Sequence, residues 1–213
     1  MFIELVDSLR CLERHDETWL VAGVTRMDGR HIVEGVLGCP ICRREYPVHD
    51  GIAWFTTRSE LDSAPVSRAP VAADSDWTTR AAALLGLADA GGIVCLSGEW
   101  IDCADALSDL EPSHVVLLNA QPDGSSSPVI SGIMVDDRLP FGAATVRAAA
   151  LGGESNGLFA SAAECLRSRG RLVGPVTANV PTGVVELARD ANHWVAERGA
   201  LTSPPVPLRS ARR

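Results

Sequence analysis

Three cysteines and one histidine in the first 42 residues have the spacing of metal ligands. Cys39 and Cys42 form a C-x-x-C pair, and such a turn aims two thiolates at one point while its backbone N–H groups stabilise their charge. Cys11 is the third candidate, and His15 follows it by four residues. A structural zinc ion takes four ligands, so these residues together predict a closed Cys₃His site without an open position for catalysis.

Other interpretations of the same residues stay open. The C-x-x-C pair would also suit a redox pair, although it does not begin a helix after a strand, or two buried thiols without a metal. His15 is the weakest of the four ligands, and Glu13, Asp16, His49 or water are alternatives for the fourth position. A module this short has few large apolar side chains with which to build a core, and this favours a bound metal.

Several kinds of catalytic site are excluded or poorly supported. All 19 basic residues are arginine, which excludes Schiff-base and pyridoxal chemistry and a lysine-containing phosphate loop. Ser97 lacks the flanking glycines of a nucleophile elbow. The remaining cysteines and histidines lie in or beside apolar segments, where we expect structural roles: Cys95, Cys103, Cys165, His114 and His193.

The elements around the cysteines predict a β-rich module over residues 1–57. The segments 18–24 and 31–38 have the character of strands, and they flank Asp28-Gly29, a pair typical of hairpin turns. Asp50-Gly51 predicts a second turn before a strand that ends at Phe55. Residues 58–75 are rich in serine, alanine and proline and predict a linker.

Residues 76–213 alternate between helical segments and short apolar runs, which predicts βαβ units around a mostly parallel sheet. The fold expected is a doubly wound, Rossmann-like α/β sheet with a terminal antiparallel pair. The expected helices are 77–88, 101–110, 158–169 and 184–190. The expected strands are 93–98, 114–120, 132–137, 145–152 and 171–176, followed by the pair 193–198 and 206–209.

The run GCPICRREYPVHDGIAWF resembles the second half of a zinc-ribbon family, which includes the small activator subunit of tRNA and translation-factor methyltransferases. The pattern is a cysteine pair, then Tyr46-Pro47-Val48, then Asp50-Gly51-Ile52 and an apolar end. The resemblance covers about the first 57 residues. It departs in the first half, where the family often has a second cysteine close after the first and this chain has Glu13-Arg14-His15.

Residues 76–213 resemble class I S-adenosylmethionine-dependent methyltransferases. DDRLPFG (residues 136–142) and AAECLRSRGRLVGPV (residues 162–176) carry the resemblance. It implies a cofactor crevice at Gly98 after the first strand, Asn119 after the second and Asp136, or its neighbour Asp137, after the third. Asn119 stands where the family has an acid for the ribose hydroxyls, and an amide bonds a hydroxyl without charge assistance.

The loop after the first strand leads us to expect a vestigial crevice. A glycine-rich loop lets the backbone approach the cofactor, yet only Gly98 remains here, followed by Glu99 and Trp100. A carboxylate and an indole would then stand where S-adenosylmethionine belongs, so we do not expect that cofactor to bind. The leading hypothesis is a non-catalytic binding or assembly module, and the alternative is an active methyltransferase acting on RNA, protein or a small molecule. A third option is a fold that binds another nucleotide or small ligand in the same crevice.

Charge and hydropathy limit the partners. The net charge of −8 over 213 residues argues against binding to nucleic acid through phosphate contacts. No apolar run is long enough to cross a membrane, and the first residues do not form a signal peptide. We expect a cytoplasmic protein with a protein partner or self-association.

Overall fold

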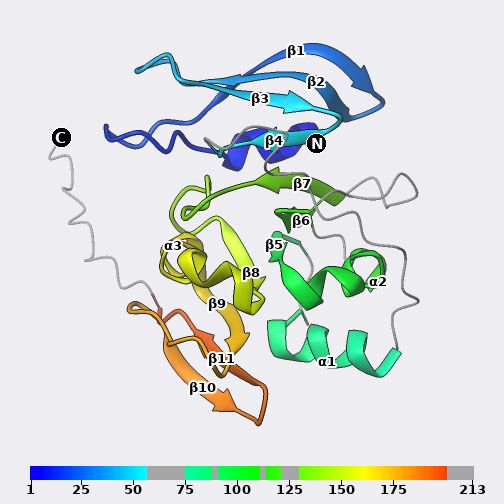
Figure 1. Ribbon diagram of the computed structural model, residues 1–213, viewed down its shortest axis with the longest axis vertical. Coiled ribbons are helices and arrows are strands. Elements are labelled where there is room, and N and C mark those ends of the chain that lie inside the picture. The colour runs from blue at the N-terminus through cyan, green and yellow to red at the C-terminus, as the bar shows by residue number, and fades with distance from the viewer. Residues whose placement is uncertain (57–74, 88–90, 111–113, 121–129, 201–213) are drawn as a thin grey trace, which may run out of the picture.

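The computed structural model describes residues 1–56, 75–87, 91–110, 114–120 and 130–200. Within these ranges the strands form one eleven-stranded sheet with the order β1-β2-β3-β4-β7-β6-β5-β8-β9-β11-β10 (Figure 1). The expected linker over residues 58–75 lies outside the described residues except at Ser75, and so does the expected strand 206–209. None of the described helices is long and apolar enough to cross a membrane.

The first four strands are antiparallel and follow one another along the chain: β1 (Val21–Asp28), β2 (His31–Gly38), β3 (Glu45–His49) and β4 (Ile52–Trp54). Gly29 lies in the turn between β1 and β2, with φ of 55°. Asp50 and Gly51 join β3 to β4 with φ of 48° and 78°, and two successive positive φ angles are what a two-residue hairpin of type I′ requires. Both hairpin turns expected from the sequence are therefore confirmed.

Six neighbouring strands, from β4 to β9, are all parallel. They continue the sheet in the order β7 (Ile130–Met134), β6 (His114–Leu118), β5 (Ile93–Leu96), β8 (Val146–Ala150) and β9 (Leu166–Pro175). The last two strands, β11 (His193–Glu197) and β10 (Val185–Arg189), are antiparallel to their neighbours. The structure thus confirms a mixed α/β sheet in which the central strands are parallel.

Helices cover both faces of the parallel strands, so alternate residues of one strand belong to different hydrophobic clusters. In β5, Val94 and Leu96 pack in a cluster with α1 (Ser75–Leu85), the 3₁₀ helix η2 (Gly98–Cys103) and α2 (Ala104–Leu110). Ile93 and Cys95 of the same strand pack in a second cluster with α3 (Phe159–Cys165). Successive side chains of a strand point to opposite faces, so the sheet is a central layer between helices.

Strand β4 joins the cysteine-containing strands to the parallel strands. Its three residues pair in parallel with β7, and Ala53 lies opposite Ile133. One continuous core contains Leu5 of the 3₁₀ helix η1 (Ile3–Ser8), Leu37 of β2 and Phe141. The residues near the amino terminus therefore pack against the same core as the α/β strands.

Three of the expected helices are corrected by the structure. The segment 184–190 is strand β10, because its backbone pairs with β11 in a hairpin and this tertiary ladder overrides local helical propensity. The expected helix 158–169 ends at Cys165, since Leu166 already pairs with Val146 of β8. The expected helix 101–110 begins instead as the 3₁₀ turn η2 and becomes α-helical at Ala104.

Ala53→Asp is expected to lower the free energy of unfolding by about 3 kcal/mol or more, because it places an unpaired carboxylate in a fully buried position between β3 and β7. Urea unfolding followed by circular dichroism measures the change. Val24→Asp, at an exposed position of edge strand β1, is the control and should change stability little. Equal stability of the two variants would contradict the buried junction.

Candidate metal centre and strand-end crevice

The four predicted metal ligands come together at one end of the β1–β3 sheet. The sulfur atoms of Cys11, Cys39 and Cys42 and a ring nitrogen of His15 all lie within 4.8 Å of one another. Cys11 Sγ is 3.6 Å from Cys42 Sγ, and Cys39 Sγ is 3.4 Å from His15 Nε2. Ligands about 2.1–2.3 Å from a tetrahedral zinc ion are about 3.5–3.8 Å apart, so this cluster could hold zinc.

Neighbouring backbone groups favour the metal-binding forms of His15 and Cys39. His15 Nδ1 lies 2.6 Å from the carbonyl oxygen of Asp16, so the proton belongs on Nδ1 and Nε2 keeps its lone pair toward the cluster. Burial acts to raise the pKa of Cys39, but the backbone N–H groups of Cys42 and Ile41 and the adjacent thiols outweigh it and lower the pKa to about 6. A thiolate is the form that binds a metal.

Tyr46 lies directly behind the cluster and contacts the segment that carries Cys11. Its hydroxyl lies 3.4 Å from Cys11 Sγ and accepts the backbone N–H of Leu12 at 3.1 Å. The ring is buried and stacks on Phe55 with centroids 4.5 Å apart. Tyr46 thus fixes the segment that carries Cys11, a role that the sequence showed only as part of the Tyr-Pro-Val pattern.

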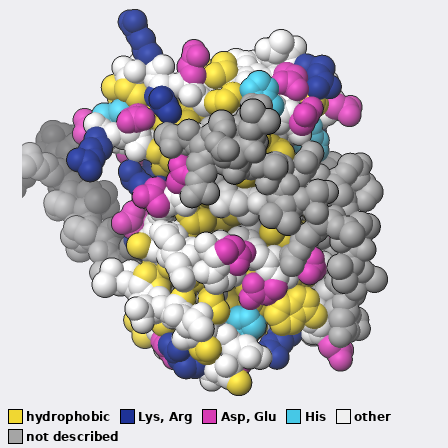
Figure 2. Space-filling model, viewed as in Figure 1, with side chains coloured by type: hydrophobic (Ala, Val, Ile, Leu, Met, Phe, Trp, Pro, Cys, Tyr) yellow, Lys and Arg dark blue, Asp and Glu magenta, His cyan; other side chains and the backbone are white. Residues whose placement is uncertain are grey.

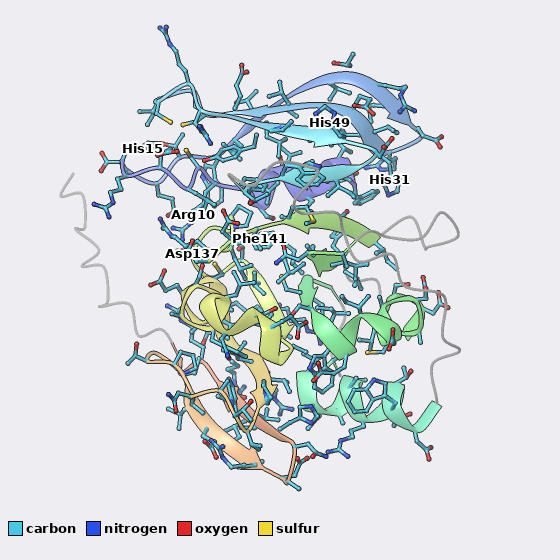
Figure 3. The ribbon with its side chains drawn as sticks, in the orientation of Figure 1. Arg10, His15, His31, His49, Asp137 and Phe141 are labelled. Carbon is cyan, nitrogen blue, oxygen red and sulfur yellow. The ribbon has the colours of Figure 1, made fainter. Side chains whose placement is uncertain are left out.

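Two alternatives for the fourth ligand, His49 and Glu13, have other side-chain partners. His49 lies beside Glu34, with Nδ1 3.0 Å from a carboxylate oxygen, and Figure 3 shows it far from His15 along the sheet. A carboxylate oxygen of Glu13 is 3.7 Å from Arg44. Asp16 contributes its carbonyl oxygen to His15. The geometry therefore favours His15 as the fourth member of the cluster.

The second candidate site is at the carboxyl ends of the parallel strands. After β5 the chain first adds β6 and β7 on one side and then returns to place β8 on the other. Such a reversal leaves a crevice between the strand-end loops, where α/β sheets bind ligands. Gly98, Asn119 and Asp136 follow the ends of β5, β6 and β7, so the structure places all three predicted residues along this edge.

Each of the three residues has a defined local geometry. Gly98 and Asn119 have φ angles of 62° and 57°, which turn the chain sharply as it leaves the sheet. The side-chain oxygen of Asn119 accepts the backbone N–H of Val135 at 2.8 Å, and this bond ties the end of β6 to the end of β7. Asp136 accepts a hydrogen bond from the Thr56 hydroxyl at 2.6 Å.

Trp100 does not stand in the crevice, which corrects the expectation from the sequence. The residue is fully buried among the side chains of α1, η2 and α2. Its ring stacks on Trp77 with centroids 4.8 Å apart and meets the edge of His193 at 4.9 Å. The physical reason is the 3₁₀ turn η2, which places a large apolar side chain in the helix layer rather than above Gly98.

Two carboxylates and a histidine gather around Gly98 and Gly152. A Cβ on Gly98 would lie 2.4 Å from a carboxylate oxygen of Glu154, and one on Gly152 would lie 2.8 Å from oxygens of both Glu154 and Glu99. His193 Nε2, at the start of β11, is 3.4 Å from the other oxygen of Glu99. Sequence reasoning missed the roles of Glu154 and His193, since their positions follow from strand pairing and not from a local motif.

Two buried hydroxyls hold the facing loops together. Ser97 Oγ lies 2.8 Å from Ser155 Oγ and accepts the backbone N–H of Gly152 at 3.0 Å. This contact joins the loop after β5 to the loop after β8. Ser97 is therefore a structural residue at the base of the crevice, as its flanking sequence indicates.

The remaining thiols lie in the interior. Burial raises the pKa of Cys95 well above its usual value, and it raises the pKa of Cys103 to about 12 and that of Cys165 to about 11. A thiol in this environment stays protonated and unreactive at neutral pH. The structural role expected for these three cysteines is consistent with their burial.

No family profile and no curated protein matches the chain. The solved structures that it resembles include several methyltransferases. A putative sarcosine dimethylglycine methyltransferase from Galdieria sulphuraria is 14% identical, with 46% of this chain and 44% of that chain covered and a TM-score of 0.38. The precorrin-6y C5,15-methyltransferase from Geobacter metallireducens is 11% identical, with 63% and 92% covered and a TM-score of 0.36.

The methyltransferase MycE of the mycinamycin biosynthetic pathway, solved with magnesium, S-adenosylhomocysteine and mycinamycin VI, is 12% identical at a TM-score of 0.46. That alignment covers 62% of this chain and 48% of that protein. This chain thus spans less than half the length of MycE and of the Galdieria protein. At these identities and TM-scores, what those proteins bind or methylate does not transfer to this chain.

Trp100→Ala is expected to destabilise the protein by about 3–5 kcal/mol, because it removes a fully buried indole and leaves a cavity beneath α1. Thermal and urea unfolding measure the loss. Leu187→Ala, at an exposed position of β10, serves as the control and should be close to neutral. A Trp100→Ala protein as stable as the wild type would show that the indole does not support the helix layer.

Proposed function

We propose that the crevice at the carboxyl ends of β5 to β8 binds S-adenosylmethionine and that the protein is a methyltransferase. The observation that carries the proposal is the position of Trp100, because its burial in the helix layer removes the indole that would have filled the crevice. The residues at the ends of β5, β6 and β7 are then those that the methyltransferase resemblance assigns to the cofactor.

The charges of the crevice fit this ligand. S-adenosylmethionine carries an ammonium group, a sulfonium group and one carboxylate, so its net charge is positive, and the carboxylates of Glu99 and Glu154 border Gly98 and Gly152. The Glu99 side chain is 43% exposed, so it can face a ligand without being fully desolvated. A carboxylate that meets an ammonium group forms a charge-assisted hydrogen bond, which is stronger than a bond between neutral groups.

The side chains at the ends of the next strands suit the uncharged parts of the cofactor. The Asn119 side-chain oxygen is engaged by Val135, so its amide N–H groups are the ones to donate to a ribose hydroxyl. Asp136, after β7, is the acid that the resemblance assigns to the adenine. When bound, S-adenosylmethionine would supply a methyl group from its positively charged sulfur to a nucleophile, and the demethylated cofactor would be released as S-adenosylhomocysteine.

The chain's own contribution to such a reaction is binding and orientation. The Ser97–Ser155 contact fixes the two loops relative to each other, so the carboxylates that meet the ligand are held in place. Holding two reactants in the correct geometry is a large part of catalysis in itself. The methyl acceptor remains to be identified, and RNA, protein and small molecules are the classes to screen.

One observation favours a second candidate, a non-catalytic binding or assembly module. The Glu154 carboxylate lies close above Gly98, so a protein side chain occupies part of the space that a cofactor backbone contact would use. In this candidate the carboxylate closes the crevice, and the exposed apolar side chains of β1, Val21, Val24 and Met27, serve a protein partner. The two candidates assign Glu154 opposite effects on ligand binding.

We further propose that the Cys₃His cluster binds one structural zinc ion and that residues 1–57 form a zinc ribbon. Four protein ligands leave no open coordination position, so the metal would stabilise the fold and not take part in the reaction. The ribbon would then rigidify the strands that join the α/β sheet through β4. This proposal is independent of S-adenosylmethionine binding.

Glu154→Ala separates the two functional candidates by the sign of its effect. If Glu154 accepts the ligand's ammonium group, the variant should bind S-adenosylmethionine about tenfold more weakly than the wild type, the loss of one charge-assisted hydrogen bond. Isothermal titration calorimetry with S-adenosylmethionine and S-adenosylhomocysteine measures both proteins. Glu186→Ala, at an exposed carboxylate on β10, is the matched control and should bind as the wild type does.

Binding that is detected only after Glu154→Ala would support the closed, non-catalytic candidate. Binding by neither protein would overturn the methyltransferase proposal. Saturable binding by the wild type, weakened in the variant, would support it, and a screen of methyl acceptors would follow.

Metal analysis of the purified protein is expected to give about one zinc per chain, and Cys39→Ser should reduce this value to near zero. Loss of the ion should also lower the melting temperature, because the loops that carry Cys11 and Cys42 lose their cross-link. Cys165→Ser, at a buried thiol far from the cluster in sequence, is the control and should keep the zinc. Full zinc content in the Cys39→Ser protein would contradict the ligand set.

A further inference from the structure

A pocket rich in arginine lies at the opposite, amino-terminal edge of the parallel strands. It has a volume of about 310 Å³ and is bordered by the end of α1 and the beginnings of β8 and β9. Four arginines line it: Arg147, Arg167, Arg169 and Arg171. Glu197 is the one carboxylate among its described lining residues.

Two of these arginines also support the fold. The guanidinium of Arg147 is buried at 3% exposure and donates to the carbonyl oxygens of Gly91 at 3.0 Å and Gly86 at 3.2 Å. Arg171 donates to the carbonyl oxygen of Ala83 at 2.8 Å, in the last turn of α1. Cations at a helix carboxyl end satisfy carbonyls that have no partner within the helix. These contacts fix the positions of both guanidinium groups.

The other two arginines have no such structural task among the described residues. The pairing of β8 with β9 jumps from Val146↔Leu166 to Ala148↔Arg171, so residues 167–170 bulge out of the ladder. This bulge carries Arg167 and Arg169, and Arg169 has a φ of 62°, a conformation that non-glycine residues rarely adopt. Within the part of the chain that the structure describes, neither side chain contacts a carboxylate or a carbonyl oxygen.

The charge of the pocket is opposite to that of the whole protein. Among its described lining residues are four arginines and one glutamate, in a chain whose net charge is −8. The carboxylate of Glu197 is 3.8 Å from Arg171, so it offsets part of the charge at that residue. Like charges repel across such a pocket, and an anion would relieve the repulsion. Figure 2 shows that arginine side chains on the visible face gather at the two ends of the molecule, over β1–β3 and near β10.

We propose that this pocket binds the phosphate group of a small phosphorylated metabolite. The planar guanidinium group donates two parallel hydrogen bonds to a phosphate, which makes arginine the preferred residue for this recognition. The volume lies at the lower end of the range for small-ligand pockets, and the acidic body of the protein disfavours a long polyanion. The pocket is at the opposite edge of the sheet from the proposed cofactor crevice, so the two sites are tested separately.

Isothermal titration calorimetry with inorganic phosphate, pyrophosphate and adenosine monophosphate, in a chloride buffer of constant ionic strength, tests the proposal. The wild type should bind at least one of these anions saturably. The double variant Arg167→Ala/Arg169→Ala should bind it at least about tenfold more weakly, because it loses charge-assisted hydrogen bonds to the anion. It keeps Arg147 and Arg171, whose hydrogen bonds hold the end of α1. Its melting temperature should stay near that of the wild type.

Arg26→Ala is the matched control, since Arg26 is an exposed arginine on β1 that pairs with Glu34. It should bind the anion as the wild type does. If the double variant fails to fold, the single variant Arg167→Gln provides the same comparison. Absence of saturable binding by the wild type, or equal binding by wild type and variant, would overturn the proposal, as would tighter binding of a single-stranded RNA that depends on the same arginines.

Discussion

The parallel pairing of β4 with β7 joins the antiparallel strands β1–β4 to the parallel strands, and the relative position of the two candidate sites depends on it. It is only three residues long, yet it brings the strands that carry the cysteine cluster into the same sheet as the strands that form the crevice. A short pairing of this kind is stable only when both of its faces are buried. Ile52 and Trp54 pack with Met134 on one face, while Ala53 belongs to the large core on the other. The Cys₃His cluster and the crevice are therefore parts of one framework.

Hydrogen bonds position the loops of the crevice, and apolar packing positions the helices beside them. Ser97 and Ser155 hold two loops at a fixed separation through buried hydroxyls, and Trp100 anchors the helix layer beneath them. The carboxylates of Glu99 and Glu154 lie at the mouth of the crevice and are exposed to water. The charged side chains therefore lie above a base that is packed and hydrogen-bonded.

The two edges of the sheet differ in charge for reasons that can be traced to single segments. At the carboxyl edge, the loops after β5 and β8 each contribute a glutamate beside a glycine. At the amino edge, the bulge in β9 carries Arg167 and Arg169, and Arg171 follows it directly, so three arginines within five residues lie near the end of α1. Both features depend on strands that are far apart in the chain but adjacent in the sheet.

The local features of this protein can be predicted from its sequence. The Asp-Gly turns, the C-x-x-C loop and the central parallel strands follow from backbone sterics and from side-chain periodicity, which act over a few residues. Three further features appear only in the folded chain: 184–190 is a strand, Trp100 faces the helix layer and Glu154 meets Gly98. These outcomes depend on which neighbour a segment pairs with or packs against, and that neighbour is set by contacts between residues distant in sequence, which no local pattern specifies.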